Sequence, residues 1–186
     1  MPFGSLWLPV VVSTAAVFLV SSFLHMVLKH HKADYKKLPG EEGVAEAMRK
    51  SPAPPGLYVM PYCVDPAEMK DPAVRKRYDD GPVALVTMLR NGPPAMGKHL
   101  VQWLALCFLT SFVAAYVARH TLTPGADGLT VMRITGTVAL VGYAFGYFQD
   151  SIWKGIPWAN SLRGIADAAV YALATGLVFR ILWPGS

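Results

Sequence analysis

The chain has 186 residues, of which 53% are hydrophobic and only 16% are charged. Soluble domains carry about 25% charged residues, and disordered chains combine low hydrophobicity with high charge, so the composition excludes both classes. The formal net charge is +5 and the mean hydropathy is +0.35. The two cysteines, Cys63 and Cys107, form no CxxC motif, which excludes a disulfide scaffold or a cysteine-rich zinc site.

Four apolar runs are long enough to cross a hydrocarbon core of about 30 Å at about 1.5 Å per residue. The first run, residues 6–28, contains no charged residue and lacks the basic leader and cleavage site of a secretion signal, so we interpret it as a retained span. The other runs cover residues 99–118, 131–149 and 162–183. The predicted fold is therefore an all-α membrane protein with four transmembrane helices.

The predicted organisation has three parts. The first transmembrane helix lies within residues 1–28, a partly structured insert covers residues 29–98, and the other three helices lie within residues 99–186. With the N-terminus outside, 14 of the 17 Lys and Arg residues fall in the inner segments or at their edge. Because inner loops are enriched in Lys and Arg, we expect both termini to be outside and the insert to be cytoplasmic.

The insert is predicted to contain short elements separated by proline and glycine. Asp65-Pro66 and Asp71-Pro72 each combine a capping side chain with a proline that suits the first helical position. The predicted elements, in order, are a basic continuation of the first helix over 29–37, a helix over 41–50, a strand over 57–63, a brief turn from Pro66, a helix from Pro72 to Asp79 and a strand over 83–89. A small hairpin is one arrangement open to the insert.

Asp167 is the main candidate for a functional side chain, because ionisable residues inside spans are rare and costly. Arg163 precedes it by four residues and Tyr171 follows it by four, so all three share one helix face. One interpretation is structural, with Asp167 bonded to Arg163, to Lys154 or to a tyrosine. The alternative is that Asp167 carries a proton or a cation.

The histidines provide a second set of candidates. His25 and His99 lie near the inner ends of the first two spans, where two facing imidazoles can ligate a haem iron. A copper site would need residues that have no motif spacing, namely Met60, Cys63, His30 and His31. The sequence therefore predicts no metal site and no cofactor, and haem binding remains the alternative.

Small residues at intervals of four predict where helices pack closely in the membrane. They occur on the third and fourth runs, as Gly142, Gly146, Gly164, Ala168, Ala172 and Gly176.

The last third of the chain carries a recognisable pattern: Trp153-Lys154-Gly155-Ile156-Pro157, then Asp167, Tyr171, Gly176 and Trp183. In this pattern the chain resembles a domain-of-unknown-function family of small bacterial inner-membrane proteins with four spans. The resemblance implies the four-span fold and a bacterial inner membrane, and it implies no chemistry.

No enzyme motif is present, because the chain contains no P-loop, GxSxG, HExxH or GxGxxG sequence. Its basic residues are not interleaved with aromatic ones, so we expect no nucleic-acid partner. We expect a non-catalytic accessory or assembly subunit of a larger inner-membrane complex, whose partners are the lipid bilayer and other membrane subunits or further copies of itself. The alternative is a small transporter or channel that uses Asp167, and the third hypothesis is a haem-binding redox protein.

Overall fold

The computed structural model describes residues 3–28 and 30–185. The chain divides into two compact units, which we call the bundle (residues 1–36 and 95–186) and the insert (residues 37–94). Within the described residues, the bundle holds four helices that are long and apolar enough to span a membrane: Gly4–Leu28, Met96–Thr121, Gly128–Lys154 and Trp158–Ile181. The prediction of an all-α, multi-pass membrane fold is therefore confirmed.

The helices extend beyond the apolar runs at most of their ends. In chain order they are α1 (Trp7–Phe23), α4 (Met96–Thr121), α5 (Gly128–Lys154) and α6 (Trp158–Ile181), and a short 3-10 turn, η1 (Phe3–Leu6), precedes α1. Helix α6 begins four residues before the apolar run that predicts it, because the turn after α5 is short. Asp167 is consequently nine residues beyond the first residue of α6.

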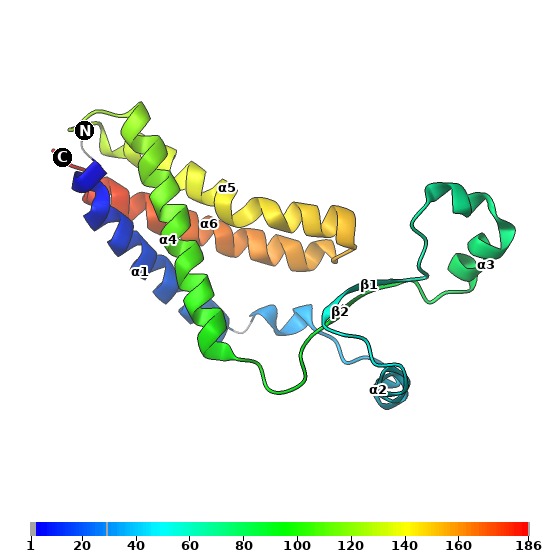
Figure 1. The fold of residues 1–186 in the computed structure, drawn as a ribbon. Helices are drawn as coiled ribbons and strands as arrows, with labels where there is room; N and C mark the ends of the chain where they lie inside the picture. The colour runs from blue at the N-terminus through cyan, green and yellow to red at the C-terminus, as the bar shows by residue number, and fades with distance from the viewer. Residues whose placement is uncertain (1–2, 29, 186) are drawn as a thin grey trace. The chain divides into compact units, whose positions relative to one another are not determined.

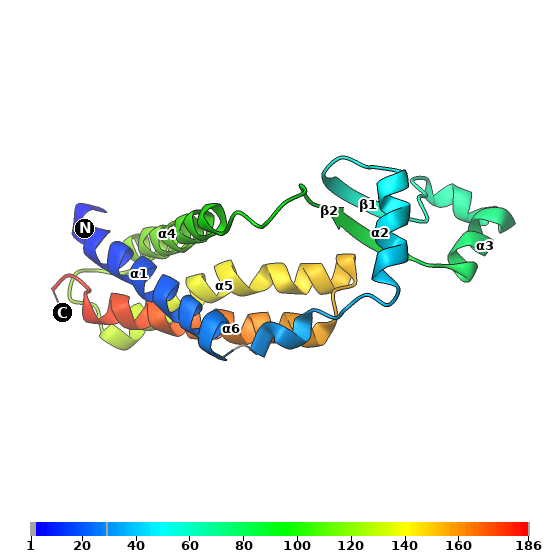
Figure 2. The ribbon, with the colours of Figure 1, turned by 90° about the horizontal axis from the view of Figure 1, so that it is seen from below.

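The four helices form a closed ring. Helices α5 and α6 are an antiparallel hairpin with the most extensive contact in the bundle, and α1 packs against both α4 and α6, while α4 packs against α5 (Figures 1 and 2). The hairpin turns at Gly155, whose φ of 67° lies in the left-handed region that favours glycine. We refer to the end of the bundle that carries this turn as the loop end, and to the other end, which carries both termini, as the terminal end.

Two apolar clusters fill the interior of the ring. The cluster at the terminal end joins all four helices and contains Leu6, Val10, Ala114, Ala115, Ala118, Val131, Phe179 and Trp183. The second cluster, nearer the loop end, contains Val17, Cys107, Ala139, Tyr143, Ala144, Ala168, Tyr171 and Ala172. Many members are alanines, which let the helix backbones approach closely.

Glycines bring α5 and α6 into direct backbone contact. A Cβ added at Gly176 would lie 2.9 Å from the Met132 carbonyl oxygen, and one added at Gly136 would lie 3.3 Å from the Ala172 carbonyl oxygen. A Cβ at Gly164 would lie 2.4 Å from the ring of Tyr147. A side chain at Gly176 would therefore push the hairpin apart, and one at Gly164 would have to displace the ring of Tyr147.

The insert contains two helices and a two-stranded antiparallel hairpin. Its elements are α2 (Glu41–Lys50), β1 (Gly56–Met60), the 3-10 turn η4 (Pro66–Lys70), α3 (Pro72–Asp80) and β2 (Ala84–Met88). Strand β1 pairs with β2 so that Gly56 lies opposite Met88 and Met60 opposite Ala84. Both predicted caps form, because Asp65 accepts from the Ala67 N–H and Asp71 accepts from the Ala73 N–H.

The chain between α1 and the insert differs from its prediction. The first helix does not continue as a basic α-helical extension over 29–37. It ends in a π turn, η2 (Leu24–Leu28), and a separate 3-10 turn, η3 (His30–Asp34), follows. Lys29 lies outside the described residues. Turn η3 packs against α6, and this contact replaces the expected helical course.

Candidate functional site

Asp167 lies inside the bundle and is almost fully enclosed, with a side-chain exposure of 7%. No contact to Arg163, Lys154 or Tyr171 accounts for this burial, so the expected local partners are wrong. Lys154 instead pairs with Asp150, 2.7 Å away. The hydroxyl of Tyr171 has no hydrogen-bond partner among the described residues.

The partners of Asp167 are histidines that precede the insert. His30 Nε2 lies 2.9 Å from Asp167 Oδ1, and His31 Nε2 lies 2.8 Å from Asp167 Oδ2. His25 Nε2 lies 3.9 Å from the same Oδ2. Two oxygens of one carboxylate therefore face three imidazoles that lie more than 130 residues away in sequence.

One wide turn and one tight turn place these imidazoles. His25 lies in the π turn η2, and His30 and His31 begin the 3-10 turn η3. The rings of His25 and His31 stack, with centroids 4.7 Å apart and an angle of 15° between their planes. Single turns of π-helix are often found at functional sites, and here the turn directs one imidazole toward α6.

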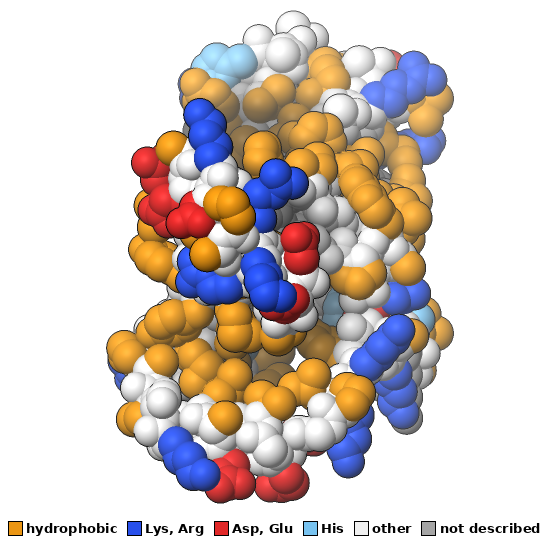
Figure 3. Space-filling view, turned by 90° about the vertical axis from the view of Figure 1, so that its right-hand side faces the viewer, with side chains coloured by type: hydrophobic (Ala, Val, Ile, Leu, Met, Phe, Trp, Pro, Cys, Tyr) orange, Lys and Arg blue, Asp and Glu red, His pale blue; other side chains and the backbone are white. Residues whose placement is uncertain are grey.

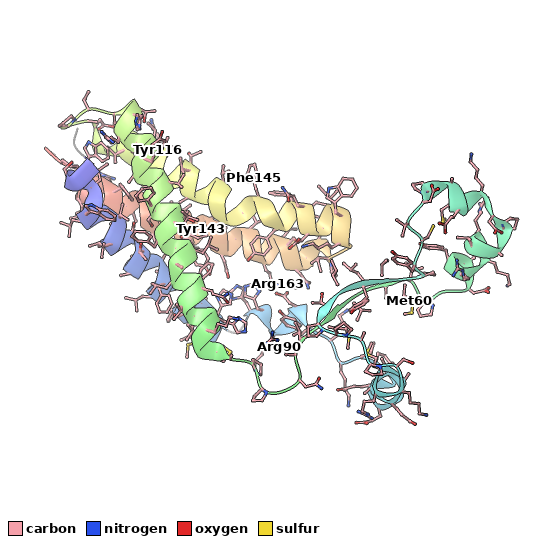
Figure 4. All side chains as sticks on the ribbon, viewed as in Figure 1. Met60, Arg90, Tyr116, Tyr143, Phe145 and Arg163 are labelled. Atoms are coloured by element: carbon pink, nitrogen blue, oxygen red, sulfur yellow. The ribbon has the colours of Figure 1, made fainter. Side chains whose placement is uncertain are left out.

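A second layer of contacts fixes η3 to the beginning of α6. Asp34 accepts from His31 Nδ1 through Oδ2, and it accepts from the Arg163 guanidinium through Oδ1. Asn160 donates to the Asp34 carbonyl oxygen at 3.1 Å and accepts from Arg163 at 3.1 Å. Figure 4 labels Arg163 where η3 passes beside α6. The charge balance of this layer is one Asp34 carboxylate against one Arg163 guanidinium.

The hydrogen bonds define which nitrogens carry protons. His25 Nδ1 lies 3.0 Å from the Ser21 carbonyl oxygen, and a carbonyl only accepts, so Nδ1 of His25 is the protonated nitrogen. In the same way His31 Nδ1 donates to the Asp34 carboxylate. In a neutral imidazole the other nitrogen then carries a lone pair. Both Nε2 atoms, of His25 and His31, therefore direct lone pairs toward Asp167 when these rings are neutral.

The electrostatics of the outer layer follow from these contacts. Burial by itself lowers the pKa of His31, but its hydrogen bonds to Asp167 and Asp34 outweigh burial, and the pKa is raised above its usual value. Burial by itself raises the pKa of Asp34, but hydrogen bonds from His31 and Arg163 outweigh it, and the pKa is lowered. The protonated form of His31 is thus favoured beside the two carboxylates.

The geometry meets the basic requirement of a metal site. His25, His31 and Asp167 each present one ligand atom, and these three atoms lie within 4.8 Å of one another. A ligating histidine usually donates its other ring N–H to a carboxylate or a carbonyl. His31 does so to Asp34 and His25 does so to Ser21, so both rings already have the outer contacts of metal ligands.

The haem ligands considered from sequence, His25 and His99, are not brought together. His99 is exposed at the beginning of α4, and no contact between His99 and His25 is present among the described residues. Met60 and Cys63 belong to the insert, whereas His30 and His31 belong to the bundle. The haem pair of His25 and His99 therefore receives no geometric support.

Sequence reasoning missed the central feature, which is the convergence of His25, His30 and His31 on Asp167, with Asp34 holding His31 from the other side. The available signal was the clustering of three histidines and one aspartate within ten residues, directly after an apolar span, together with a single buried acid in a distant span. The histidine cluster alone is typical of an interfacial segment, and the buried acid alone is typical of a helix contact. Only the fold of η3 shows that the halves meet.

Comparison with protein-family models, with curated proteins and with solved structures finds no match to this chain. The resemblance of the last third to four-span inner-membrane proteins stays a prediction, and the function is argued from the chain's own residues.

Proposed function

We propose that the protein is an integral membrane protein that binds a divalent transition-metal ion through His25, His31 and Asp167. The observation that carries the proposal is the convergence of His25, His31 and Asp167, which each present one ligand atom within 4.8 Å of the other two. Nε2 of His25 and Nε2 of His31 lie 3.9 and 2.8 Å from Asp167 Oδ2. Coordination by two imidazoles and one carboxylate suits zinc, iron and related ions, whereas calcium and magnesium prefer oxygen ligands alone.

The charges of the cluster also favour a cation. When the histidines are neutral, the cluster contains two carboxylates, Asp34 and Asp167, and one guanidinium, Arg163. The guanidinium pairs with Asp34, so Asp167 has no permanent positive partner. A buried carboxylate without compensation is costly. A divalent ion at the three ligand atoms supplies that compensation, and His30 continues to hold the second oxygen of Asp167.

The enclosure of Asp167 bears on the transport alternative. A side chain that exchanges protons or cations along a path needs access to water, whereas Asp167 is 7% exposed and is held by two histidines. His30 Nδ1 is buried without a partner among the described residues. These contacts favour retention of an ion that links α1 and η3 to α6, and they do not favour passage.

The experiment is a measurement of Zn²⁺ affinity with the full chain in lipid nanodiscs, by competition with a chromophoric chelator. His25→Gln is the sharpest variant, because His25 is 3.9 Å from Asp167 and its side chain is 52% exposed, so its loss leaves the direct Asp167 contacts intact. His99→Gln is the matched control, because His99 is exposed and lies in another helix.

We expect one Zn²⁺ per chain, with the affinity reduced at least about tenfold by His25→Gln and more by His31→Gln or Asp167→Asn. His99→Gln should bind as the parent does. The proposal is wrong if the parent chain binds no Zn²⁺ below millimolar concentration, or if His99→Gln reduces the affinity as much as His25→Gln. In that case the cluster is an ion-paired helix contact only.

A second candidate function is the accessory subunit expected from sequence, and the surface of the insert favours it. Val74 is the one hydrophobic residue of the described insert that is buried, at 9% exposure, while Leu57, Tyr62 and Leu89 are 61%, 70% and 77% exposed. Figure 3 shows hydrophobic side chains lying among basic and acidic ones on the face that it presents. Exposed apolar side chains outside the spans are typical of a surface that binds another protein.

The accessory role is tested by photo-crosslinking in native membranes. A photoreactive amino acid at the position of Leu89 should form a product of one defined mass with a partner subunit, whereas the same amino acid at the position of Lys50, on the polar end of α2, should not. Crosslinks to lipid alone, or equal products from both positions, would contradict this role. The bacterial inner membrane, with both termini outside, is the location that we propose for such a complex.

A further inference from the structure

A groove of about 450 Å³ runs between α5 and α6, which lie side by side in Figures 1 and 2. Its described lining includes Leu129, Met132 and Leu140 from α5 and Ala169 and Leu173 from α6. None of the described lining residues comes from α1 or α4, so the groove is on the outer face of the ring. Because both helices qualify as membrane spans, this face meets the lipid.

Small residues form the floor of the groove and larger apolar ones form its sides. A Cβ added at Gly136 would lie 3.3 Å from the Ala172 carbonyl oxygen, so the two backbones nearly touch and no long side chain rises between them. Leu129 and Leu173 are 47% and 55% exposed. A lipid-facing groove with an apolar wall of this kind suits a flexible hydrocarbon chain.

Two arginines lie at the terminal end of the groove. Arg133 is one of the lining residues, five positions after the first residue of α5. Arg180 is next to the last residue of α6 and shares a helix face with Leu173, seven residues earlier. A Cβ added at Gly128 would lie 3.1 Å from Arg180 Cγ, so the stem of Arg180 packs against the beginning of α5.

The positive charge at this end exceeds the negative charge. Residues 1–33, 101–149 and 168–186 contain a single acidic residue, Asp127. Its carboxylate caps α5, where it accepts from the N–H and the hydroxyl of Thr130 at 3.0 and 3.1 Å. These hydrogen bonds, with a smaller contribution from Arg133, hold the pKa of Asp127 below its usual value, so it is ionised. Neither Arg133 nor Arg180 forms an ion pair within the described residues.

We propose that the groove binds one anionic phospholipid of the phosphatidylglycerol kind, with its phosphate against Arg133 and Arg180 and one acyl chain over Gly136 and Ala172. Two guanidinium groups against one carboxylate leave one positive charge, which a head group with a single negative charge compensates. Leu140 follows Arg133 by seven residues, or about 10 Å of helix, so the middle of the chain lies beside it. None of the proposed metal ligands lines the groove, so the proposal is independent of the metal site.

A second copy of the chain fits the same groove less well. Copies of a membrane protein insert with one orientation, so two copies that met through the groove about a two-fold axis would present the same patch to each other. The arginines of both copies would then lie together at the terminal end, where like charges repel. A lipid phosphate compensates the charge that a second copy would double.

The test is photo-labelling of the full chain in phosphatidylcholine vesicles that contain a small fraction of a phosphatidylglycerol with a diazirine midway along one acyl chain. A phosphatidylcholine with the same diazirine chain is the matched probe, because only its head group differs. Mass spectrometry of the digested protein locates the labels. We expect the anionic probe to label residues 137–140 and 169–173 about fivefold more than the zwitterionic probe, and both probes to label Leu109, which is 56% exposed on α4, equally.

Four variants have matched roles. Arg133→Gln should reduce the excess labelling by the anionic probe about fivefold, and Arg180→Gln should reduce it less, because Arg180 is not among the lining residues. Arg119→Gln is the control, since it removes the same charge near the terminal end of α4, which does not line the groove. Ala169→Phe should abolish the excess, because Ala169 is exposed in the groove and a phenyl ring fills it, whereas Ala166→Phe, exposed on another part of α6, should not.

The possible outcomes separate the occupants. Equal labelling of residues 137–140 by the two probes would overturn the proposal, as would an equal effect of Arg119→Gln and Arg133→Gln. Protection of residues 137–140 from both probes, while Leu109 is labelled, would show that a second copy covers the groove and would also overturn it. His25→Gln should leave the ratio of the two probes unchanged, so failure of the metal site and failure of the lipid site are distinguishable.

Discussion

The two ends of the bundle hold α1 against α6 by opposite means. At the terminal end Leu6 and Val10 are fully buried in one apolar cluster with Phe179 and Trp183. At the loop end, turns η2 and η3 are held by hydrogen bonds and charge, through His30 and other polar side chains that converge on Asp167. The same pair of segments is thus joined by packing at one end and by a polar network at the other.

Apolar packing and a polar network differ in how strongly they respond to substitution. Lipid tails are as apolar as leucine, so apolar helix contacts in a membrane gain only closer packing and tolerate substitution. A buried polar network stabilises the fold most when every member is hydrogen-bonded. The whole network is destabilised when one member is removed. We therefore expect substitutions at the loop end to act locally and strongly, and those at the terminal end to act weakly and broadly.

The largest effect is expected from Asp167→Ala. This change leaves His30 without its acceptor, and likewise His31 when its ring carries both protons. Removal of one partner from a buried pair costs about 3 kcal/mol or more. Hydrogen exchange measured by mass spectrometry should show faster exchange over residues 30–34, while residues 7–17 remain as protected as in the parent. Unchanged exchange over residues 30–34 would contradict a network that depends on Asp167.

Phe179→Ala should have the next largest effect. Phe179 is fully buried, but its loss from a lipid-surrounded bundle removes packing more than hydrophobic transfer, so we expect about 2 kcal/mol, below the 3–5 kcal/mol of soluble cores. Reversible unfolding in detergent measures it. Phe145→Ala is the control, since Phe145 is 54% exposed and points away from α6 (Figure 4). Equal losses from both variants would show that burial in the ring does not decide the cost.

A smaller effect is expected from Arg163→Lys. The guanidinium contacts Asp34 through two nitrogens, at 2.6 Å for Nε, and a lysine offers a single ammonium group. We expect about 1 kcal/mol less stability at η3 and a Zn²⁺ affinity lowered by about tenfold, because Asp34 orients His31. The same chelator competition measures the affinity. A full loss of binding would indicate that Arg163 does more than hold Asp34.

The smallest effect is expected from Lys154→Ala. Lys154 and Asp150 are four residues apart at the loop end of α5, and their side chains are 52% and 40% exposed. Pairs of this kind contribute about 0.3–0.5 kcal/mol. The unfolding midpoint of Lys154→Ala should differ from that of the parent by less than the midpoint of Phe145→Ala does. A larger shift would mean that the exposed pair belongs to the polar network.

The spans and the elements of the insert were predictable, because their causes are local. An uncharged run of sufficient length predicts a span whatever surrounds it, and Asp71-Pro72 predicts the beginning of α3 because cap and proline lie in adjacent positions. The sequence predicted two strand candidates and a small hairpin as one way of joining them, but it did not predict the register that places Gly56 opposite Met88.

The candidate site was predictable only in part. Asp167 was identified because a carboxylate inside a span has a high cost. Its partners were not, since i and i+4 spacing pointed to Arg163, whereas that guanidinium turns to Asp34. The contact between His31 and Asp167 spans 136 residues and depends on the turns after α1, for which single-residue preferences carry little information.

The π turn η2 has a consequence for insertions and deletions in this chain. Each residue of an α-helix turns the chain by about 100°, and the wider turn over Leu24–Leu28 takes up additional backbone at the end of α1. Removal of one residue from this turn would rotate His30 and His31 away from α6 although every side chain of the site remained in the sequence. The helical register at the end of α1, and not composition alone, therefore preserves the site.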